Sequence, residues 1–405
     1  METRINVKNS ISRKTIGNLF LLIGILIITT LEWHFYEWYE SFTKYGTLIT
    51  FAALTVAFFC YVDINTAIKD KFVWLMVITD AVALTNLFIL KSNKGCILIV
   101  VDFMLILYLI DKVEFSRFES IVMLSYVGAF FFYWTIDVKG YFKGYNTNYG
   151  GLILITGFAC VMVLMQMLYE KRAEEYDTVS LNKNNRVEFY KNNWWIFLLY
   201  VVLIIISFKI ISWYRSRTAL MGLVVLLALI FIPAKIIINK FIYSTICVLA
   251  TIGSVAFSGI YILLGGINGG EGVQLFYKDI ISGRNEIWSE LWYAFLDKPF
   301  TGIGSSYEMK LEYMAGMLEA HSAMMDILVI HGIVVFVLLC GFFLFRLFKF
   351  REKAMAGGVN KAIFAAIICV LITGFFENYY IVQPFSLILL CLFTINPKKT
   401  QSTNC

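Results

Sequence analysis

The sequence predicts an all-α, polytopic integral membrane protein with about 12 transmembrane helices. Of its 405 residues, 60% are hydrophobic and only 15% are charged, and the mean hydropathy is +0.75. A soluble fold cannot bury that much apolar surface. The apolar runs are continuous and show no period-two alternation, which argues against strands. We therefore expect a single membrane domain over residues 1–405.

Twelve apolar segments are long enough to cross the bilayer core, which takes about 20 residues and tolerates shorter spans inside a bundle. The first ends without a small-residue cleavage site, so we expect it to be retained as a span. Residues 169–193 are polar and lack an apolar period, which predicts a cytoplasmic linker between an N-terminal bundle (16–168) and a C-terminal catalytic half (194–405). The predicted spans cover residues 16–34, 46–62, 72–90, 96–110, 119–136, 150–168, 194–212, 218–233, 241–264, 321–345, 359–376 and 382–396.

The Lys and Arg residues collect in alternate loops between the predicted spans. The positive-inside rule then places both ends of the chain in the cytoplasm. The net charge of +6 does not form one basic stripe, so we expect no nucleic-acid partner. The same alternation places the long hydrophilic loop at residues 265–320 outside the cytoplasm.

This outer loop predicts two short helices. Ser282 is a suitable N-cap for the first, which we expect to rest on the membrane surface and to end at Pro299. The second is expected between Glu308 and Glu319. The apolar residues that repeat at helical spacing in the first are Ile287, Trp288, Leu291, Trp292 and Phe295.

Three arginines on the predicted outer side point to a phosphate ligand. Arg215 and Arg217 occupy a short outer turn, against the positive-inside bias. The alternative is that both reach lipid headgroups and only anchor the turn. Arg284 opens a helix, where a cation opposes the helix dipole and an anionic partner is favoured. Guanidinium groups match phosphate oxygens bidentately and keep their charge.

The order of several short motifs in the C-terminal half resembles the O-antigen ligase and repeat-unit polymerase family. The resemblance depends on their order, their common predicted side and the predicted topology. The motifs are Ser216-Arg217-Thr218-Ala219, Ser282-Gly283-Arg284 with Ile287-Trp288, Pro299 with Gly302-Ile303-Gly304, Ala320-His321-Ser322, and Glu377-Asn378.

The resemblance implies a GT-C-like, inverting, metal-independent glycosyltransferase that moves a glycan from an undecaprenyl diphosphate carrier onto an acceptor sugar. Arg217 and Arg284 would stabilise the departing diphosphate, whose negative charge grows in the transition state. Arg215, Ser282 and Glu377 would bind the diphosphate or the acceptor. We expect no cofactor and no metal.

His321 is the candidate base for the acceptor hydroxyl, since an imidazole accepts a proton near neutral pH. The alternative is an interfacial histidine that moves no proton. Ser322 stands where the family commonly has Asn. Asp326, five positions on, is a candidate to orient His321, although this spacing gives imperfect facing on a helix.

Three more polar residues fall within predicted spans. Asp80 and Asp102 are interpreted as partners in interhelical hydrogen bonds, with a proton path as the alternative. His331 is interpreted as a packing residue.

The leading functional hypothesis is a polymerase that joins undecaprenyl-diphosphate-linked repeat units into a capsular, exopolysaccharide or O-antigen chain. The active site would lie on the extracytoplasmic face of a bacterial plasma (inner) membrane. Expected partners are the lipid-linked oligosaccharide, the growing polysaccharide or acceptor glycan, membrane lipid, a flippase and a chain-length regulator. One alternative is ligation of the same donor to another acceptor. Another is a lipid-linked sugar transporter or flippase, which would predict an internal repeat that the sequence does not clearly show.

Overall fold

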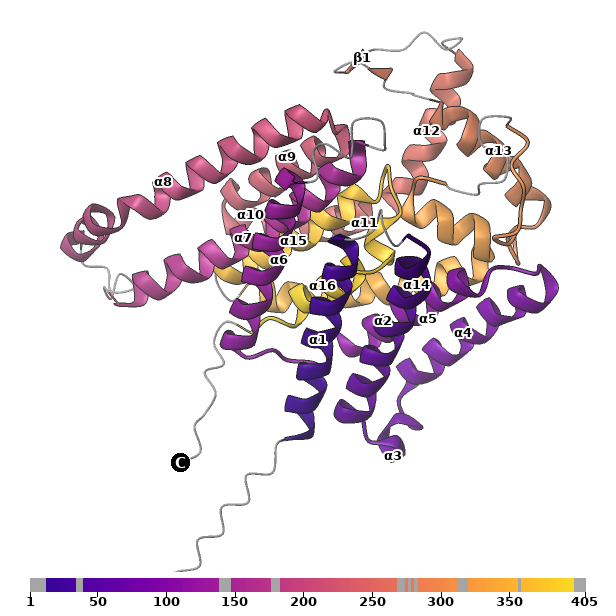
Figure 1. Cartoon of the computed structure of the whole chain (residues 1–405), viewed down its shortest axis with the longest axis horizontal. Coiled ribbons are helices and arrows are strands. Elements are labelled where there is room, and N and C mark those ends of the chain that lie inside the picture. Colours follow the sequence, from indigo (N-terminus) through magenta and orange to yellow (C-terminus); the bar gives the residue numbers. More distant parts are fainter. Residues whose placement is uncertain are drawn as a thin grey trace, which may run out of the picture.

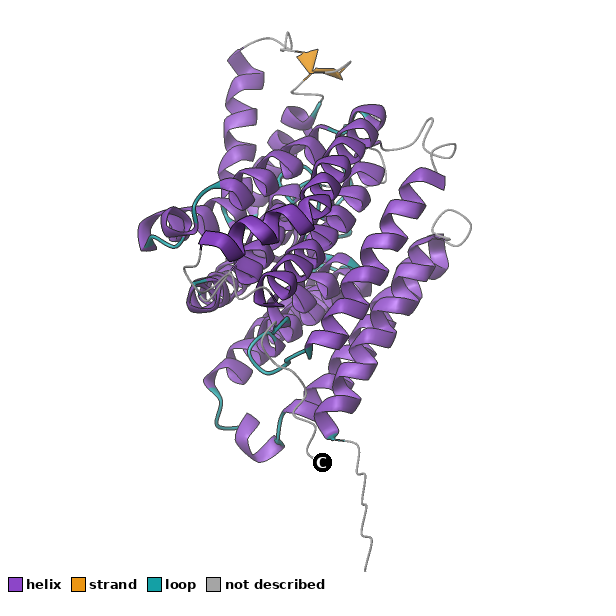
Figure 2. Ribbon diagram, turned by 90° about the vertical axis from the view of Figure 1, so that its left-hand side faces the viewer, coloured by secondary structure: helices purple, strands orange, loops and turns teal. Residues whose placement is uncertain are grey.

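The computed structural model describes residues 12–33, 39–137, 147–175, 183–267, 274–275, 278–279, 283–311, 320–355 and 358–396. These residues form a helical bundle, with one antiparallel pair of two-residue strands near its rim (Figures 1 and 2). The long helices are α1 (Arg13–Trp33), α2 (Tyr39–Tyr61), α4 (Lys71–Ile89), α5 (Lys94–Leu109), α6 (Arg117–Asp137), α7 (Thr147–Glu175), α8 (Lys183–Tyr214), α9 (Arg217–Phe231), α11 (Lys240–Thr251), α12 (Gly253–Ile267), α13 (Arg284–Asp297), α14 (Ala323–Ala354), α15 (Gly358–Thr373) and α16 (Phe385–Thr394). The short elements are α3 (Ile64–Ala67), α10 (Ala234–Ile237), η3 (Tyr379–Ile381), β1 (Gln274–Leu275) and β2 (Lys278–Asp279).

Every predicted span overlaps a helix, and several of these helices are suited to cross a membrane. Five are long and apolar enough by themselves, within α1, α4, α7, α8 and α14. The chain is therefore a multi-pass membrane protein, whereas the number of 12 spans and the GT-C-like architecture stay predictions.

The predicted span at 241–264 is not one continuous helix. It consists of α11 and α12, which are bent by 61° at a short break. The Thr251 hydroxyl bonds back to the Cys247 carbonyl at 2.8 Å, an interaction that bends helices. Gly253, which has a low helix propensity, follows at once.

The predicted linker at 169–193 is largely helical in its described part. Helix α7 continues to Glu175, and α8 begins at Lys183 and is kinked at Asn193. Glu, Lys and Arg are good helix formers, so a polar segment that lacks an apolar period can still extend its neighbouring helices. The division into two bundles stays a prediction.

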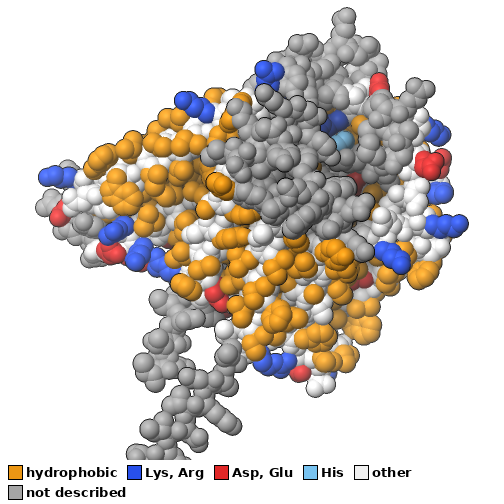
Figure 3. All heavy atoms as spheres, viewed as in Figure 1, with side chains coloured by type: hydrophobic (Ala, Val, Ile, Leu, Met, Phe, Trp, Pro, Cys, Tyr) orange, Lys and Arg blue, Asp and Glu red, His pale blue; other side chains and the backbone are white. Residues whose placement is uncertain are grey.

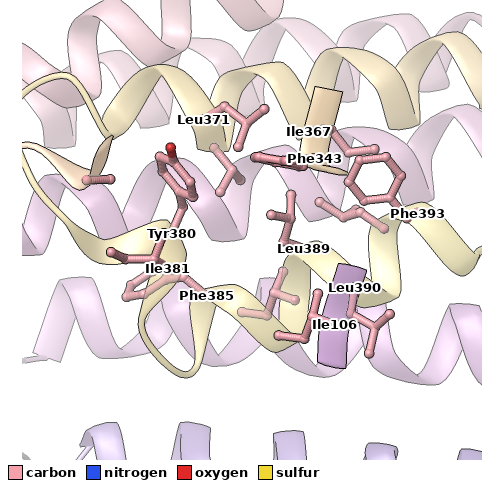
Figure 4. Packing of buried hydrophobic residues seen from close by; sticks show 14 of the residues in the cluster. Ile106, Phe343, Ile367, Leu371, Tyr380, Ile381, Phe385, Leu389, Leu390 and Phe393 are labelled. Carbon is pink, nitrogen blue, oxygen red and sulfur yellow. The ribbon is translucent and has the colours of Figure 1, made fainter. Parts of the chain in front are cut away.

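Helices α15 and α16 form the centre of the bundle. Helices α7, α9 and α11 pack on α15, and every residue of α16 is buried. Figure 4 shows how Phe343, Tyr380 and Phe385 interleave with aliphatic side chains at this centre. Helices α4 and α8 instead expose large apolar side chains, as at Phe88 and Phe197. Figure 3 shows apolar side chains over much of this surface, with Lys and Arg toward its edges, as expected for contact with lipid.

The loops rich in Lys and Arg meet at one end of the bundle. Arg346 forms an ion pair with Asp111, and Lys349 binds the same carboxylate at 2.8 Å. At this end the Arg351 side chain also donates to the Ile238 carbonyl, and the Lys361 side chain donates to the Ile230 carbonyl. These loops are the ones that the charge distribution assigns to the cytoplasm.

Described parts of several other loops meet at the opposite end, which carries α13 (Figure 1). The backbone NH of Asn93 donates to the Ser305 hydroxyl at 2.6 Å, and Gln383 donates to Thr47 at 3.0 Å. For the described loops joined by these contacts, the grouping agrees with the one that the positive-inside rule predicts. The location of this second end outside the cell stays a prediction.

Helix α13 is confirmed, but its start and its environment differ from expectation. Its N-cap is Gly283, with φ of 75°, and Ser282 lies outside the described residues. Its apolar face, including Trp288 and Leu291, is buried against α12 and α14 rather than facing a membrane surface. Helices α12 and α14 pack against this apolar face of α13 and cover it. Of the predicted second helix, residues 308–311 are not helical, and residues 312–319 lie outside the described part.

The segment 299–304 docks into a break in α14. Gly332 interrupts the helix with φ of 83° and ψ of 171°, a conformation essentially restricted to glycine. The segment pairs with the backbone beside this break: Ile303 N donates to Val329 O at 2.9 Å, and Ile333 N donates to Pro299 O at 2.8 Å. The outer loop is thereby fixed to the bundle by main-chain hydrogen bonds.

Candidate functional site

Glu377 joins two other predicted site residues. Its side chain is fully buried and lies just after α15. One carboxylate oxygen accepts from Arg284 Nη2 at 3.2 Å, and the other lies 3.2 Å from His321 Nδ1. The structure thus brings Arg284, His321 and Glu377, from three separate segments, into one cluster, which we call the Arg–Glu–His cluster.

Arg284 opens α13 and points into the protein. Its Nη2 also donates to the Phe376 carbonyl at 3.2 Å, and its guanidinium lies over the Phe376 ring at 5.4 Å. The residue is only 8% exposed. The sequence predicted an anionic partner for this cation, and in the structure Glu377 supplies that negative charge.

The backbone around His321 is held from three directions. His321 itself has φ of 47°, which is uncommon for a residue other than glycine. Ala320, the residue before it, is anchored at both of its backbone polar atoms: Ala320 N donates to Asp326 at 3.2 Å, and Ala320 O accepts from Trp288 Nε1 at 2.6 Å. Asp326 also accepts from Asn378 at 2.7 Å. We call Trp288, Asp326 and Asn378 the histidine clamp.

Sequence reasoning identified the clamp only in part. Asp326 was a candidate to orient His321, and the structure shows it bound to the backbone that precedes this histidine. Trp288 was interpreted only as part of an apolar face, although its indole NH requires a hydrogen-bond partner once buried. Asn378 follows Glu377 directly in the sequence, and this position next to a candidate site residue was the signal that could have identified it.

Arg215 and Arg217 lie on a neighbouring element at the same end of the bundle. Ser216 caps α9 through a hydrogen bond from Ala219 N at 3.3 Å. Arg215 is exposed with φ of 52°, and Arg217 is half-buried in the first turn. Helix α9 packs along α15, where a methyl group added to Gly222 would contact Thr373. Since Thr373 is the last residue of α15, this packing brings the start of α9 to the end that carries Glu377.

The polar residues predicted within spans behave differently from one another. His331 is 2% exposed and packs in the interior, as predicted. Neither carboxylate oxygen of the buried Asp102 has a hydrogen-bond partner among the described residues, so its predicted interhelical hydrogen bond is not formed there. For Asp80 the same is true of one oxygen. In the described part of the chain, no three His, Cys, Asp or Glu side chains are grouped so that they could hold a metal ion.

By its fold and its site, the chain is a multi-pass helical membrane protein with a buried Arg–Glu–His cluster at one end. Residues 201–340 match the family described as O-antigen ligase, the family that the sequence motifs resemble. The matched region contains Arg215, Arg217, Arg284 and His321, whereas Glu377 lies beyond it. Members of the family are ligases and polymerases of the glycosyltransferase type. Comparisons with curated proteins and with solved structures find no match.

Proposed function

We propose that this chain is a polymerase that joins undecaprenyl-diphosphate-linked oligosaccharide repeat units into a surface polysaccharide. The transfer inverts the anomeric carbon and takes place on the extracytoplasmic face of a bacterial plasma membrane. The observation that carries the proposal is the contact of His321 with the buried Glu377 carboxylate, beside Arg284 and at the end of the bundle away from the Lys-rich and Arg-rich loops.

His321 acts as the general base. Its Nδ1 bound to Glu377 favours the tautomer whose Nε2 accepts a proton. The acceptor hydroxyl oxygen attacks the anomeric carbon of the donor sugar and its proton passes to Nε2, while the bond from that carbon to the diphosphate oxygen breaks. The leaving group takes the electron pair and departs as undecaprenyl diphosphate. Glu377 stabilises the imidazolium that forms.

The arginines act on the leaving group. Its negative charge increases as the bond breaks, so fixed cations lower the barrier more than they strengthen substrate binding. Arg217, in the first turn of α9, is the main contact for the diphosphate, and Arg215 adds charge beside it. Arg284 serves two purposes, because it holds Glu377 and adds positive potential where the diphosphate leaves.

The proposal is tested with purified protein in lipid nanodiscs and a defined undecaprenyl-diphosphate oligosaccharide. We expect a ladder of products that persists in EDTA. Arg217→Ala should abolish the ladder, whereas Arg172→Ala should not, because Arg172 is an exposed arginine that pairs with Glu175 within α7. A normal ladder from Arg217→Ala, or a strict need for divalent metal, would overturn the mechanism.

The same assay separates polymerisation from ligation, the alternative that uses the same cluster. A polymerase extends the lipid-linked repeat units in the absence of any other acceptor. A ligase makes one transfer and only when a second acceptor, such as a lipid A core, is supplied. A single product that requires this second acceptor would replace the polymerase proposal by the ligase one.

A further inference from the structure

A recess of 480 Å³ lies farther along α13 than the Arg–Glu–His cluster. This volume falls in the range of small-ligand sites. One wall is the later part of α13 and the other is the segment 303–310. The side chains that line it include Glu290, Tyr293, Asp297, Lys298, Tyr307 and Lys310.

Glu290 fixes the second wall in place. One of its oxygens accepts from Lys310 N at 2.6 Å and from the Tyr307 hydroxyl at 3.1 Å. The other accepts from Leu311 N at 3.2 Å. Burial and the hydrogen bond to Glu290 raise the pKa of Tyr307, so its hydroxyl stays protonated at neutral pH. The recess is therefore held in shape before any ligand enters.

The lining selects a neutral, hydroxyl-rich ligand rather than an anion. Two carboxylates, Glu290 and Asp297, offset the two ammonium groups of Lys298 and Lys310. A phosphate would meet no net positive charge here. Tyr293 is 67% exposed and offers an aromatic surface beside these polar groups. An aromatic face next to hydrogen-bonding side chains suits a sugar ring, which has an apolar face and a polar edge.

The recess lies on the same helix as Arg284. Glu290 follows Arg284 by six residues and Asp297 follows it by thirteen, which corresponds to roughly 9 to 20 Å along the helix axis. At 3.6 residues per turn, Glu290, Tyr293 and Asp297 lie about 180° to 240° around the helix from Arg284. A glycan that reacts at the cluster therefore reaches the recess by passing across α13.

We propose that this recess is a subsite for an uncharged stretch of the growing polysaccharide. The inference rests on the proposed function, since that function brings a glycan to the cluster. By holding the chain near the cluster between additions, the subsite favours extension of a bound chain over starting a new one.

The test uses full-length protein in nanodiscs with Tyr293→Ala. Phe300→Ala is the matched control, because Phe300 is a similarly exposed aromatic on the adjoining segment but does not line the recess. The probe is the unlipidated oligosaccharide released from the same repeat units, with inorganic pyrophosphate as the anionic comparison. We expect Tyr293→Ala to weaken oligosaccharide binding roughly tenfold, to leave pyrophosphate binding unchanged and to shorten the products, with the first transfer at the wild-type rate.

The outcomes separate this inference from the proposed function. A wild-type protein that makes polymer, combined with full-length products and unchanged oligosaccharide binding in Tyr293→Ala, overturns the subsite and leaves the polymerase intact. Equal losses in Phe300→Ala, or loss of pyrophosphate binding instead, also overturn it. A wild-type protein that makes no polymer but binds the oligosaccharide through Tyr293 overturns the polymerase and supports the glycan subsite.

Discussion

Replacement of Glu377 by Gln is the sharpest probe of the Arg–Glu–His cluster. The side chain keeps nearly the same shape, but the negative charge between Arg284 and His321 is lost and one acceptor oxygen becomes an amide NH2. At 3.2 Å from each partner, a unit charge interacts with another by about 5 kcal/mol at an effective dielectric of ~20, before desolvation is counted. The carboxylate is fully buried, so water screens little of this interaction.

In the proposed mechanism, the charge matters most when His321 carries the acceptor proton. If most of that interaction is lost in the transition state, kcat falls by roughly 10³ to 10⁴, since each 1.36 kcal/mol or so corresponds to a factor of ten. A loss of about 10⁴ is known for the equivalent change behind the histidine of a serine protease triad. We therefore expect Glu377→Gln to lower kcat for the first transfer by at least about 10³.

The assay measures single-turnover transfer on protein that elutes as one monodisperse species and keeps its helical circular dichroism signal. Removal of one partner from a buried ion pair costs roughly 3 kcal/mol or more in stability, so rates are referred to folded protein only. Glu308→Gln is the control, because Glu308 is an exposed glutamate on the loop between α13 and α14. A Glu377→Gln rate within about tenfold of the wild type would refute the role given to this carboxylate.

Three further changes test the supports of the cluster. Asp326→Asn sets a second amide against that of Asn378, and we expect a loss of about 1 to 3 kcal/mol in stability with slower turnover at unchanged donor KM. Gly332→Ala forces a side chain into a glycine-only conformation and against the docked segment, so the unfolding free energy should fall by roughly 3 kcal/mol in denaturant titrations. Gly341→Ala is the control: its added methyl group meets open space, so the unfolding free energy should not fall. Trp288→Phe removes the hydrogen bond to the peptide before His321 and should lower both Tm, by calorimetry, and kcat. An unchanged kcat would show that the clamp only stabilises the fold.

The helices were predictable because bilayer length and hydropathy constrain them strongly. The separation of the loops into two ends followed from Lys and Arg alone. The 61° bend between α11 and α12 was not predictable, because both sides of the break are equally apolar and the bend depends on a local hydroxyl and a glycine. The start of α13 was displaced for a similar reason, since Gly283 adopts a left-handed conformation that hydropathy does not reveal.

The site residues were predictable as types but not as a network. Arg284 and His321 were expected to act on a ligand, and the structure shows that they share a carboxylate. Sequence separations of 37 and 56 residues carry no distance information. The role of Trp288 was hidden because an indole at helical spacing also fits an apolar face. In each case the missing information was a tertiary contact rather than a residue identity.

The docking of segment 299–304 into α14 restricts how this protein can move. Neither partner can separate without stranding unpaired peptide groups within the bundle, a cost of several kcal/mol per group where water is absent. The amides of Ile303 and Gly304 should accordingly exchange with deuterium as slowly as those of α14 itself. In the proposed function, a bulky lipid-linked donor would then enter and leave past other parts of this end of the bundle, while segment 299–304 stays fixed.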